Sequence, residues 1–290
     1  MRWPGGATVA VSFVVNYEEG GEPSYPMGDE RNSDLTETPH YTLGDYRDIG
    51  AESMYEYGSR TAIYRVLDLF REHELPTTFF ASALALERNP PIGELLMADG
   101  HEPCSHGWKW EQAWKLTREE ERERLAETVK SFERICGRRP VGIYNRYAPS
   151  VNTRELLVEE GGFLYDSDYY GDDLPFFVEV LGKRHLVVPY TLVYNDARYV
   201  LAQGFSRADD FTDLVVRALD DLRREAKAGY PKMLSIGLHP RLIGVPGRMS
   251  ALREIVEHIV AAGDCWVATR EQIAHWWIDN HESWETGSNR

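Results

Sequence analysis

The chain has 290 residues, and its 42 % hydrophobic and 12 % aromatic content is that of a folded globular protein and excludes a largely disordered one. The 47 Asp and Glu residues outnumber the 32 Lys and Arg residues and give a formal net charge of −15, which disfavours nucleic acid, anionic membranes and strongly anionic polymers as partners. The sequence contains no apolar run of about 18 residues that would cross a membrane.

Strand-like and helix-like segments alternate along the chain. Residues 7–15 form an apolar, valine-rich run that is typical of a buried parallel strand. Residues 16–58 are polar and show no clear period, and a loop of this length indicates a function such as a lid or a binding loop at an active site. Residues 59–73 have helical spacing, with one apolar face made of Ile63, Val66, Leu67 and Phe70.

The rest of the chain continues this alternation. We predict strands at 77–82, 102–105, 141–144, 163–166, 186–190, 233–238 and 265–268. We predict helices at 90–99, 117–136, 153–160, 209–228, 249–262 and 270–279. This order predicts an α/β fold with a single domain over residues 1–285, a distorted (β/α) barrel, and a frayed end at 286–290. A doubly wound open sheet is the alternative, although no glycine-rich nucleotide motif follows the first strand.

Polar side chains follow five of the predicted strands, at the ends where barrel enzymes carry their active sites. A single solvated glutamate, structural histidine or salt-bridged arginine would need no functional explanation, but two histidines at two strand ends favour a shared acid–base or metal role. The sequence therefore predicts one concave polar site. The runs are Asn16-Tyr17-Glu18-Glu19, His106-Gly107-Trp108-Lys109-Trp110, Asn145-Arg146, Asp166-Ser167-Asp168 and His239-Pro240-Arg241.

The chemistry of these runs favours water as the nucleophile. The chain has no G-x-S-x-G elbow and no H-E-x-x-H or cysteine-rich zinc motif. Cys104 is two residues from His106 and is a possible thiol nucleophile, although a buried role is the better interpretation. Activation of water by a carboxylate and a histidine, with or without a metal, fits best and predicts a hydrolase.

A series of motifs, taken together and in their order along the chain, resembles the polysaccharide deacetylase superfamily (NodB-homology domain), and within it most closely the metal-independent allantoinases. The resemblance extends from Val9 to about Trp277 and implies a distorted (β/α) barrel. The motifs are FVVNYEEGGE, YEYGSR, SHGWKW, NRYAPSVNTR, GFLYDSD, DDLPF, VPYTL and GLHPRLIGVPGR.

The resemblance also carries expectations for a metal site. The deacetylases have an aspartate base and an aspartate metal ligand after the first strand, and these positions hold Asn16 and Glu18 here. Their His-x-x-x-His motif keeps His106 but has Trp110 in place of the second histidine. We therefore expect no cofactor; if zinc or another divalent metal binds, Glu18 and His106 are its expected ligands, with Glu19 or Asp168 as a substitute third ligand.

The allantoinase resemblance implies a hydrolase of non-peptide C–N bonds that opens a cyclic amide of a small ureide, with allantoin as the first candidate. In this hypothesis Glu18, or else Glu19, activates water, and His239 protonates the leaving nitrogen. His106, Asn16 and Arg146 hold the carbonyl and stabilise its developing charge. The side chains expected to bind the substrate and wall the pocket are Tyr17, Trp108 and Trp110.

Two other functions stay open, namely a metal-dependent polysaccharide or amino-sugar deacetylase and a catalytically inactive family member that only binds ligand. The branch more often has Cys where Pro240 stands and Thr-Ser where Tyr147-Ala148 stands, which leaves the exact substrate open. The absence of a recognisable signal and the three unpaired-looking cysteines favour a cytoplasmic protein. The resemblance implies a small-molecule substrate and a homo-oligomer, with a tetramer as the first candidate.

Overall fold

The computed structural model describes residues 2–33, 35–37, 46–146, 149–202 and 204–285. Its central element is β1 (Val9–Tyr17), which is buried along its whole length. The other strands are β2 (Thr78–Ala81), β3 (Glu102–Ser105), β4 (Gly142–Ile143), β5 (Tyr165–Asp166), β6 (Phe176–Val180), β7 (Lys183–Val187), β8 (Lys232–Leu238) and β9 (Cys265–Val267).

These strands form one curled, mostly parallel sheet. Their order is β6-β7-β5-β4-β3-β2-β1-β8, and β9 pairs with the first residues of β1. Only the β6–β7 hairpin is antiparallel among the described pairs. The chain beyond β7 returns to β8 through a single parallel bridge between Asn195 and Gly237, so the sheet curls into a half-barrel. This curled sheet confirms the predicted distorted barrel in preference to a doubly wound open sheet.

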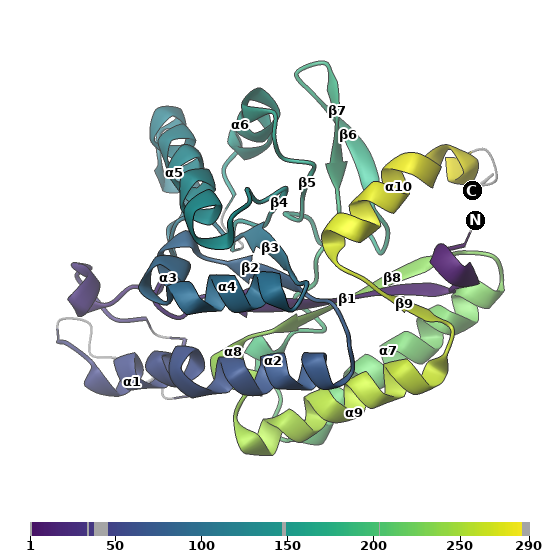
Figure 1. The fold of residues 1–290 in the computed structure, drawn as a ribbon, viewed down its shortest axis with the longest axis horizontal. Helices are drawn as coiled ribbons and strands as arrows, with labels where there is room; N and C mark the ends of the chain where they lie inside the picture. The colour runs from purple at the N-terminus through teal and green to yellow at the C-terminus, as the bar shows by residue number, and fades with distance from the viewer. Residues whose placement is uncertain (1, 34, 38–45, 147–148, 203, 286–290) are drawn as a thin grey trace.

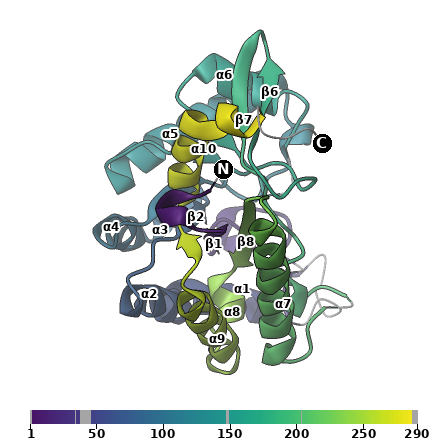
Figure 2. The ribbon, with the colours of Figure 1, turned by 90° about the vertical axis from the view of Figure 1, so that its right-hand side faces the viewer.

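Most helices cover the outer face of this half-barrel, whereas the helix at Arg270–Glu285 packs Ile273, Ala274 and Trp277 into the inner cluster. Figures 1 and 2 show α2, α7 and α9 on one side of β1, with α3, α4 and α5 on the other. No helix among the described residues is long and apolar enough to span a membrane. The helices are α1 (Ile49–Tyr57), α2 (Ile63–Glu72), α3 (Ala83–Arg88), α4 (Pro90–Ala98), α5 (Arg118–Cys136), α6 (Thr153–Glu160), α7 (Ala208–Lys227), α8 (Pro240–Ile243), α9 (Pro246–Ala262) and α10 (Arg270–Glu285).

The two faces of β1 enter two different apolar clusters. Odd-numbered residues from Val9 to Tyr17 pack with the outer helices. Ala10 and Val14 face the inside of the half-barrel, where they pack with aromatic residues that include Phe80. Because successive side chains of a strand alternate, Asn16 points to the inside and Tyr17 to the outside. The alternation of side chains along β1 therefore determines which residues at its carboxyl end point towards the centre of the barrel.

The structure differs from the sequence-based elements in several places. Residues 49–57 of the segment expected to be irregular form α1, which continues into α2 through a π-helical turn, Gly58–Ala62. Only Ala51 and Tyr55 of α1 are buried, so its sequence shows no apolar stripe. The strand predicted at 186–190 begins earlier, at Lys183, and is β7. Its antiparallel partner β6 was not predicted, because the hairpin that the two strands form carries exposed charges at Lys183 and Arg184. The short α3 and α8 were also not predicted. Residues 38–45 and the expected frayed end at 286–290 lie outside the described residues.

Candidate active site

The carboxylate of Glu18 lies at the centre of a buried polar cluster at the carboxyl end of β1. Its Oε1 is 3.1 Å from Nε2 of His106 and 3.5 Å from Nε of Arg146. Its Oε2 is 3.7 Å from Nε2 of His239 and 3.5 Å from Nη1 of Arg241. Each carboxylate oxygen therefore faces one imidazole and one guanidinium, contributed by the ends of three different strands and by the loops after them.

These neighbours determine the ionisation of Glu18. Burial alone would raise the pKa of a carboxyl group that is only 2 % exposed. The charges of His239, Arg146 and His106 and the hydrogen bond from His106 outweigh burial and hold the pKa of Glu18 well below its usual range. Glu18 is therefore an anion at neutral pH, and it is a weaker base than an ordinary glutamate.

His106 has both of its ring nitrogens engaged. Its Nδ1 lies 2.7 Å from the carbonyl oxygen of Tyr144, and that oxygen can only accept, so Nδ1 carries a hydrogen. Its Nε2 faces the ionised Glu18, which also only accepts. Two acceptors on one ring require the imidazolium form when both hydrogen bonds are made. The ring is stacked at 5.2 Å on that of Tyr144, which fixes its plane.

His239 is oriented by a buried aspartate that the sequence did not single out. Nδ1 of His239 lies 2.6 Å from Oδ1 of Asp196, and the backbone N–H of His239 donates to Oδ2 at 2.7 Å. Asp196 begins the short 3-10 turn Asp196–Tyr199, whose N-cap is the side chain of Asn195. Because Asp196 holds Nδ1–H, the remaining nitrogen, Nε2, points to Glu18 and can accept or deliver a proton there.

Arg146 and Trp110 form one wall of the cluster. The guanidinium carbon of Arg146 lies 3.2 Å from the centroid of the Trp110 ring, a cation–π contact that replaces water around the charge. Burial lowers the pKa of Arg146, and the neighbouring Glu18 opposes this effect. Arg146 has a positive φ of 43°, a conformation that non-glycine residues seldom adopt. Both side chains line a cavity of about 560 Å³ together with Lys109 and Leu35.

Glu19 links the two loops that carry the charged groups. Its Oε2 accepts from the backbone N–H of Glu18 at 3.2 Å, and its Oε1 accepts from the backbone N–H of Arg241 at 3.0 Å. Burial raises the pKa of Glu19, and the positive charge of Arg241 opposes this rise. Gly58, in the π-helical turn, packs directly on the carboxylate, where a Cβ atom would overlap it. Glu19 therefore acts on the site through backbone positions.

Asn16 lies at the inner face of the same strand end. Its Nδ2 donates to the hydroxyl of Tyr190 at 3.0 Å and to the carbonyl of Leu238 at 3.2 Å. Both contacts join β1 to neighbouring parts of the barrel. They occupy the amide N–H groups that the sequence analysis assigned to the substrate carbonyl.

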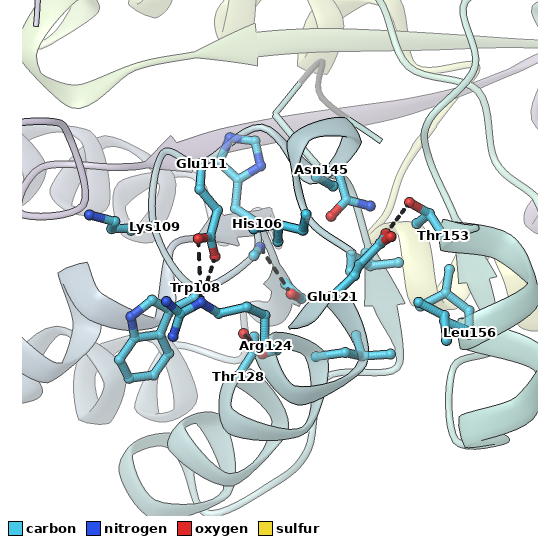
Figure 3. A pocket seen from close by; sticks show the side chains of 17 residues that line it. His106, Trp108, Lys109, Glu111, Glu121, Arg124, Thr128, Asn145, Thr153 and Leu156 are labelled. Carbon is cyan, nitrogen blue, oxygen red and sulfur yellow. Dashed lines mark hydrogen bonds and ion pairs between the residues drawn. The ribbon is translucent and has the colours of Figure 1, made fainter. Parts of the chain in front are cut away.

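The structure does not bring Tyr17 and Trp108 to the Glu18 cluster. Tyr17 lies on the outer face of β1, and its hydroxyl accepts from Asn89 at 3.1 Å. Trp108 packs against the outer apolar cluster and lines a second cavity, of about 40 Å³, between β3, β4, α5 and α6, which it shares with His106. Figure 3 shows this cavity, where Glu121 bonds to Thr153 and Arg124 pairs with Glu111. Its lining combines structural ion pairs with apolar side chains.

Two further residues complete the site that the sequence analysis predicted only in part. Arg241 belongs to the His239-Pro240-Arg241 run, but no role was predicted for it. Tyr55 lies on α1, within the segment expected to be irregular, and its ring is 4.5 Å from the guanidinium carbon of Arg241 and 5.6 Å from the Trp110 ring. The spacing of Arg241, two residues after His239, is a signal that could have identified it; Tyr55 and Asp196 had none.

The residues around Glu18 do not fit a metal ion. Among the described residues, no three His, Cys, Asp or Glu side chains are arranged to hold one. Glu18 and His106, the pair expected to bind a metal if one is present, are instead bonded to each other. Arg146 and Arg241 each place a nitrogen 3.5 Å from a different oxygen of Glu18, where their charges would repel a divalent cation.

Several known proteins are similar to this chain over nearly its whole length. The family model for polysaccharide deacetylase matches residues 48–159. A Schizosaccharomyces pombe protein described as a putative polysaccharide deacetylase is 39 % identical over 96 % of this chain and 93 % of its own. The crystal structure of a probable polysaccharide deacetylase from Pseudomonas aeruginosa PAO1 is 45 % identical, with a TM-score of 0.91 over 96 % of this chain and 94 % of its own. That of Puue allantoinase is 44 % identical, with a TM-score of 0.92 over 96 % of this chain and 93 % of its own.

Proposed function

This chain belongs to the polysaccharide deacetylase family of C–N hydrolases, and we propose that within this family it opens a cyclic amide of a small ureide, with allantoin as the first candidate substrate. The family membership confirms the resemblance drawn from the sequence motifs. The choice of a ureide within the family is supported by the 44 % identity to Puue allantoinase and by the character of the site.

The observation that carries the proposal is the set of four nitrogen groups around the Glu18 carboxylate. Hydrolysis of an amide needs a group that takes a proton from water, positive charge near the carbonyl oxygen, and a group that protonates the leaving nitrogen. His239 and Glu18 lie where they can activate the water and protonate the leaving nitrogen. Arg146 and His106 supply the positive charge near the carbonyl oxygen. All three requirements are met by protein side chains, without a metal.

The proposed proton path runs through His239. A water molecule bound beside Oε2 of Glu18 and Nε2 of His239, which are 3.7 Å apart, would attack the carbonyl carbon while its proton passes to Nε2. Asp196 stabilises the imidazolium that forms. The same proton then passes to the ring nitrogen as the C–N bond breaks, and the product is an open-chain carboxylic acid. The lowered pKa of Glu18 makes it better suited to orient the water than to act as the base, the role predicted from the sequence.

The carbonyl oxygen gains negative charge in this step. Arg146 and His106 both face Oε1 of Glu18, so we propose that they stabilise the charge from this side of the site. Glu18 is buried and Trp110 covers one face of the Arg146 guanidinium, so these charges are less hydrated than in solution and interact more strongly. A buried site of this kind suits a small molecule better than a polymer chain.

The test is hydrolysis of allantoin by purified protein that has been treated with a chelator and assayed for metal. We expect clear turnover with no stoichiometric metal. Absence of turnover, together with activity on an acetylated amino sugar when zinc is restored, would overturn the proposal in favour of a metal-dependent deacetylase. Absence of turnover on any of these amides in the folded protein would overturn it in favour of a family member that only binds ligand.

A further inference from the structure

Resting on the function proposed above, we infer that Arg241 selects the substrate by binding a second carbonyl oxygen of the ring, the one that water does not attack. The substrate class is then a cyclic ureide in which one ring N–H lies between two carbonyl groups. Neither the family likeness nor the motif analysis assigned a role to this residue.

Arg241 is a buried cation with unused hydrogen-bond donors. It is only 6 % exposed, and its Nη2 donates to the carbonyl oxygen of Leu35 at a long 3.4 Å. Its Nε and Nη1 are buried and have no hydrogen-bond partner among the residues that the structure describes. Nη1 is 3.5 Å from Oε2 of Glu18, close enough for electrostatic attraction but without a hydrogen bond. Buried donors without partners are costly and rare, so these N–H groups indicate a missing acceptor at the reacting carboxylate.

The guanidinium is held in a fixed position. It lies 4.5 Å from the Tyr55 ring centroid and 5.8 Å from that of Trp110. The Tyr55 hydroxyl is itself held by Ser33 at 2.7 Å and by the Leu35 carbonyl at 3.1 Å. Glu19 fixes the backbone N–H of Arg241. A donor that is pre-positioned in this way binds an acceptor without losing side-chain freedom, as a selective site requires.

The guanidinium groups of Arg146 and Arg241 face different oxygens of Glu18. This arrangement indicates that the substrate offers two hydrogen-bond acceptors, one to each arginine. Arg146 and His106 face Oε1 and serve the carbonyl that is attacked. Arg241 faces Oε2, and it has no role in that step. A ring with a carbonyl on each side of its N–H supplies one oxygen to each arginine. A lactam with one carbonyl would leave the buried Arg241 donors unpaired, and sites built to hydrogen-bond a group discriminate strongly against an analogue that lacks it.

The test compares two five-membered rings and two matched variants. The probes are hydantoin, which has two carbonyls around its N–H, and 2-pyrrolidinone, which has one; binding of each is measured by calorimetry, independently of turnover. Arg241→Met removes the donors and keeps most of the stem. Arg248→Met is the control, because Arg248 also stacks on a ring, that of Tyr199 at 4.6 Å, but does not face Glu18.

We expect the wild type to bind hydantoin at least about 10-fold more tightly than 2-pyrrolidinone. Arg241→Met should reduce this ratio towards one and raise the KM for allantoin about 10- to 100-fold, with a smaller effect on kcat, because binding shared by ground and transition states is lost. Arg248→Met should keep the ratio and the KM. If Arg241→Met fails to fold, Arg241→Lys, which keeps the charge and loses the planar donor set, should give a KM raised at least several-fold.

Failure of this inference can be distinguished from failure of the proposed function. An unchanged KM and binding ratio in the folded Arg241 variant, with a wild type that hydrolyses allantoin, would overturn the role of Arg241 and leave the function standing. A wild type that binds both rings equally would also overturn the selection. A wild type without allantoin turnover would overturn the function itself.

Discussion

Glu18 carries the carboxylate around which the other charged groups of the site are arranged. Replacing it by Gln removes the negative charge that His106, Arg146 and Arg241 share, and leaves these groups facing one another. We expect Glu18→Gln to lower kcat for allantoin by at least about 100-fold, because the water loses the anionic acceptor that orients it. The measurement is steady-state kinetics with circular dichroism to establish folding. A control is Glu56→Gln, at an exposed pair with Arg60.

Near-full activity in a folded Glu18→Gln protein would exclude Glu18 from the reaction. Glu56→Gln should leave both kcat and KM unchanged, since exposed ion pairs contribute little to stability and this one lies outside the cluster.

Glu22 makes the stability of the protein depend on pH. Burial raises the pKa of Glu22 from 4.5 to about 7, partly offset by a hydrogen bond from the backbone N–H of Gly20. Between these values the folded protein retains a proton that the unfolded chain releases, so stability falls as the pH rises through this window. Glu22→Gln removes this titration, and we expect it to stabilise the protein at pH 8, by up to about 3 kcal/mol, and hardly at pH 4.

Urea denaturation of the wild type and of Glu22→Gln at pH 4, 6 and 8 measures this effect. The difference in unfolding free energy between the two should grow with pH and level off above about pH 7. A difference that is independent of pH would show that Glu22 is not protonated in the folded state.

Among the elements, the π-helical turn Gly58–Ala62 has a direct connection to the site. The turn joins α1 to α2 and brings Gly58 against the carboxylate of Glu19. Such turns widen a helix by one residue and are common at functional sites. Here the turn lets Glu19 hold the backbone N–H groups of Glu18 and Arg241.

A methyl group at position 58 tests this connection. Gly58→Ala should lower the unfolding free energy by about 1–3 kcal/mol, because the new Cβ overlaps the Glu19 carboxylate, and it should lower kcat/KM as Glu18 and Arg241 shift. The control is Gly247→Ala in α9, where no atom of the described residues lies within 4 Å of the new Cβ and helix propensity favours alanine. If Gly58→Ala is as stable and active as its control, Glu19 does not position the site.

The elements also show what a sequence can predict. β1 was predicted because it is apolar on both faces, and the polar residues at the strand ends were predicted to meet because parallel strands end at one edge. The predictions that Asn16, Glu18, His106, Arg146 and His239 lie together follow from that topology alone. Asp196 and Tyr55 were not predicted, because they come from a turn and a polar helix that only long-range packing brings to the barrel. The compartment, the oligomeric state and the absence of a metal stay predictions.

At the scale of the whole molecule, β1 connects a stabilising end to a reacting end. Before β1, Trp3 is 1 % exposed, and its ring lies 4.6 Å from that of Trp276 and 5.8 Å from that of Trp266. Its indole N–H donates to the carbonyl of Lys232 at 2.8 Å. Figure 1 shows the start of the chain beside α10, at the opposite end of β1 from α1. Glu18 directly follows the other end of β1. In barrel enzymes this end serves stability and the carboxyl end serves chemistry.

This separation predicts opposite outcomes for changes at the two ends of β1. Trp3→Ala leaves a cavity among tryptophans and removes the hydrogen bond to the carbonyl of Lys232, so we expect a loss of about 3–5 kcal/mol in unfolding free energy. At a temperature where the variant stays folded, its kcat and KM for allantoin should equal those of the wild type, because none of its contacts reaches Glu18. Denaturation curves and kinetics on the same preparation make the comparison. A Trp3→Ala protein as stable as the wild type would show that this end does not stabilise the fold, and one that is folded but slow would show that the two ends of the strand are coupled.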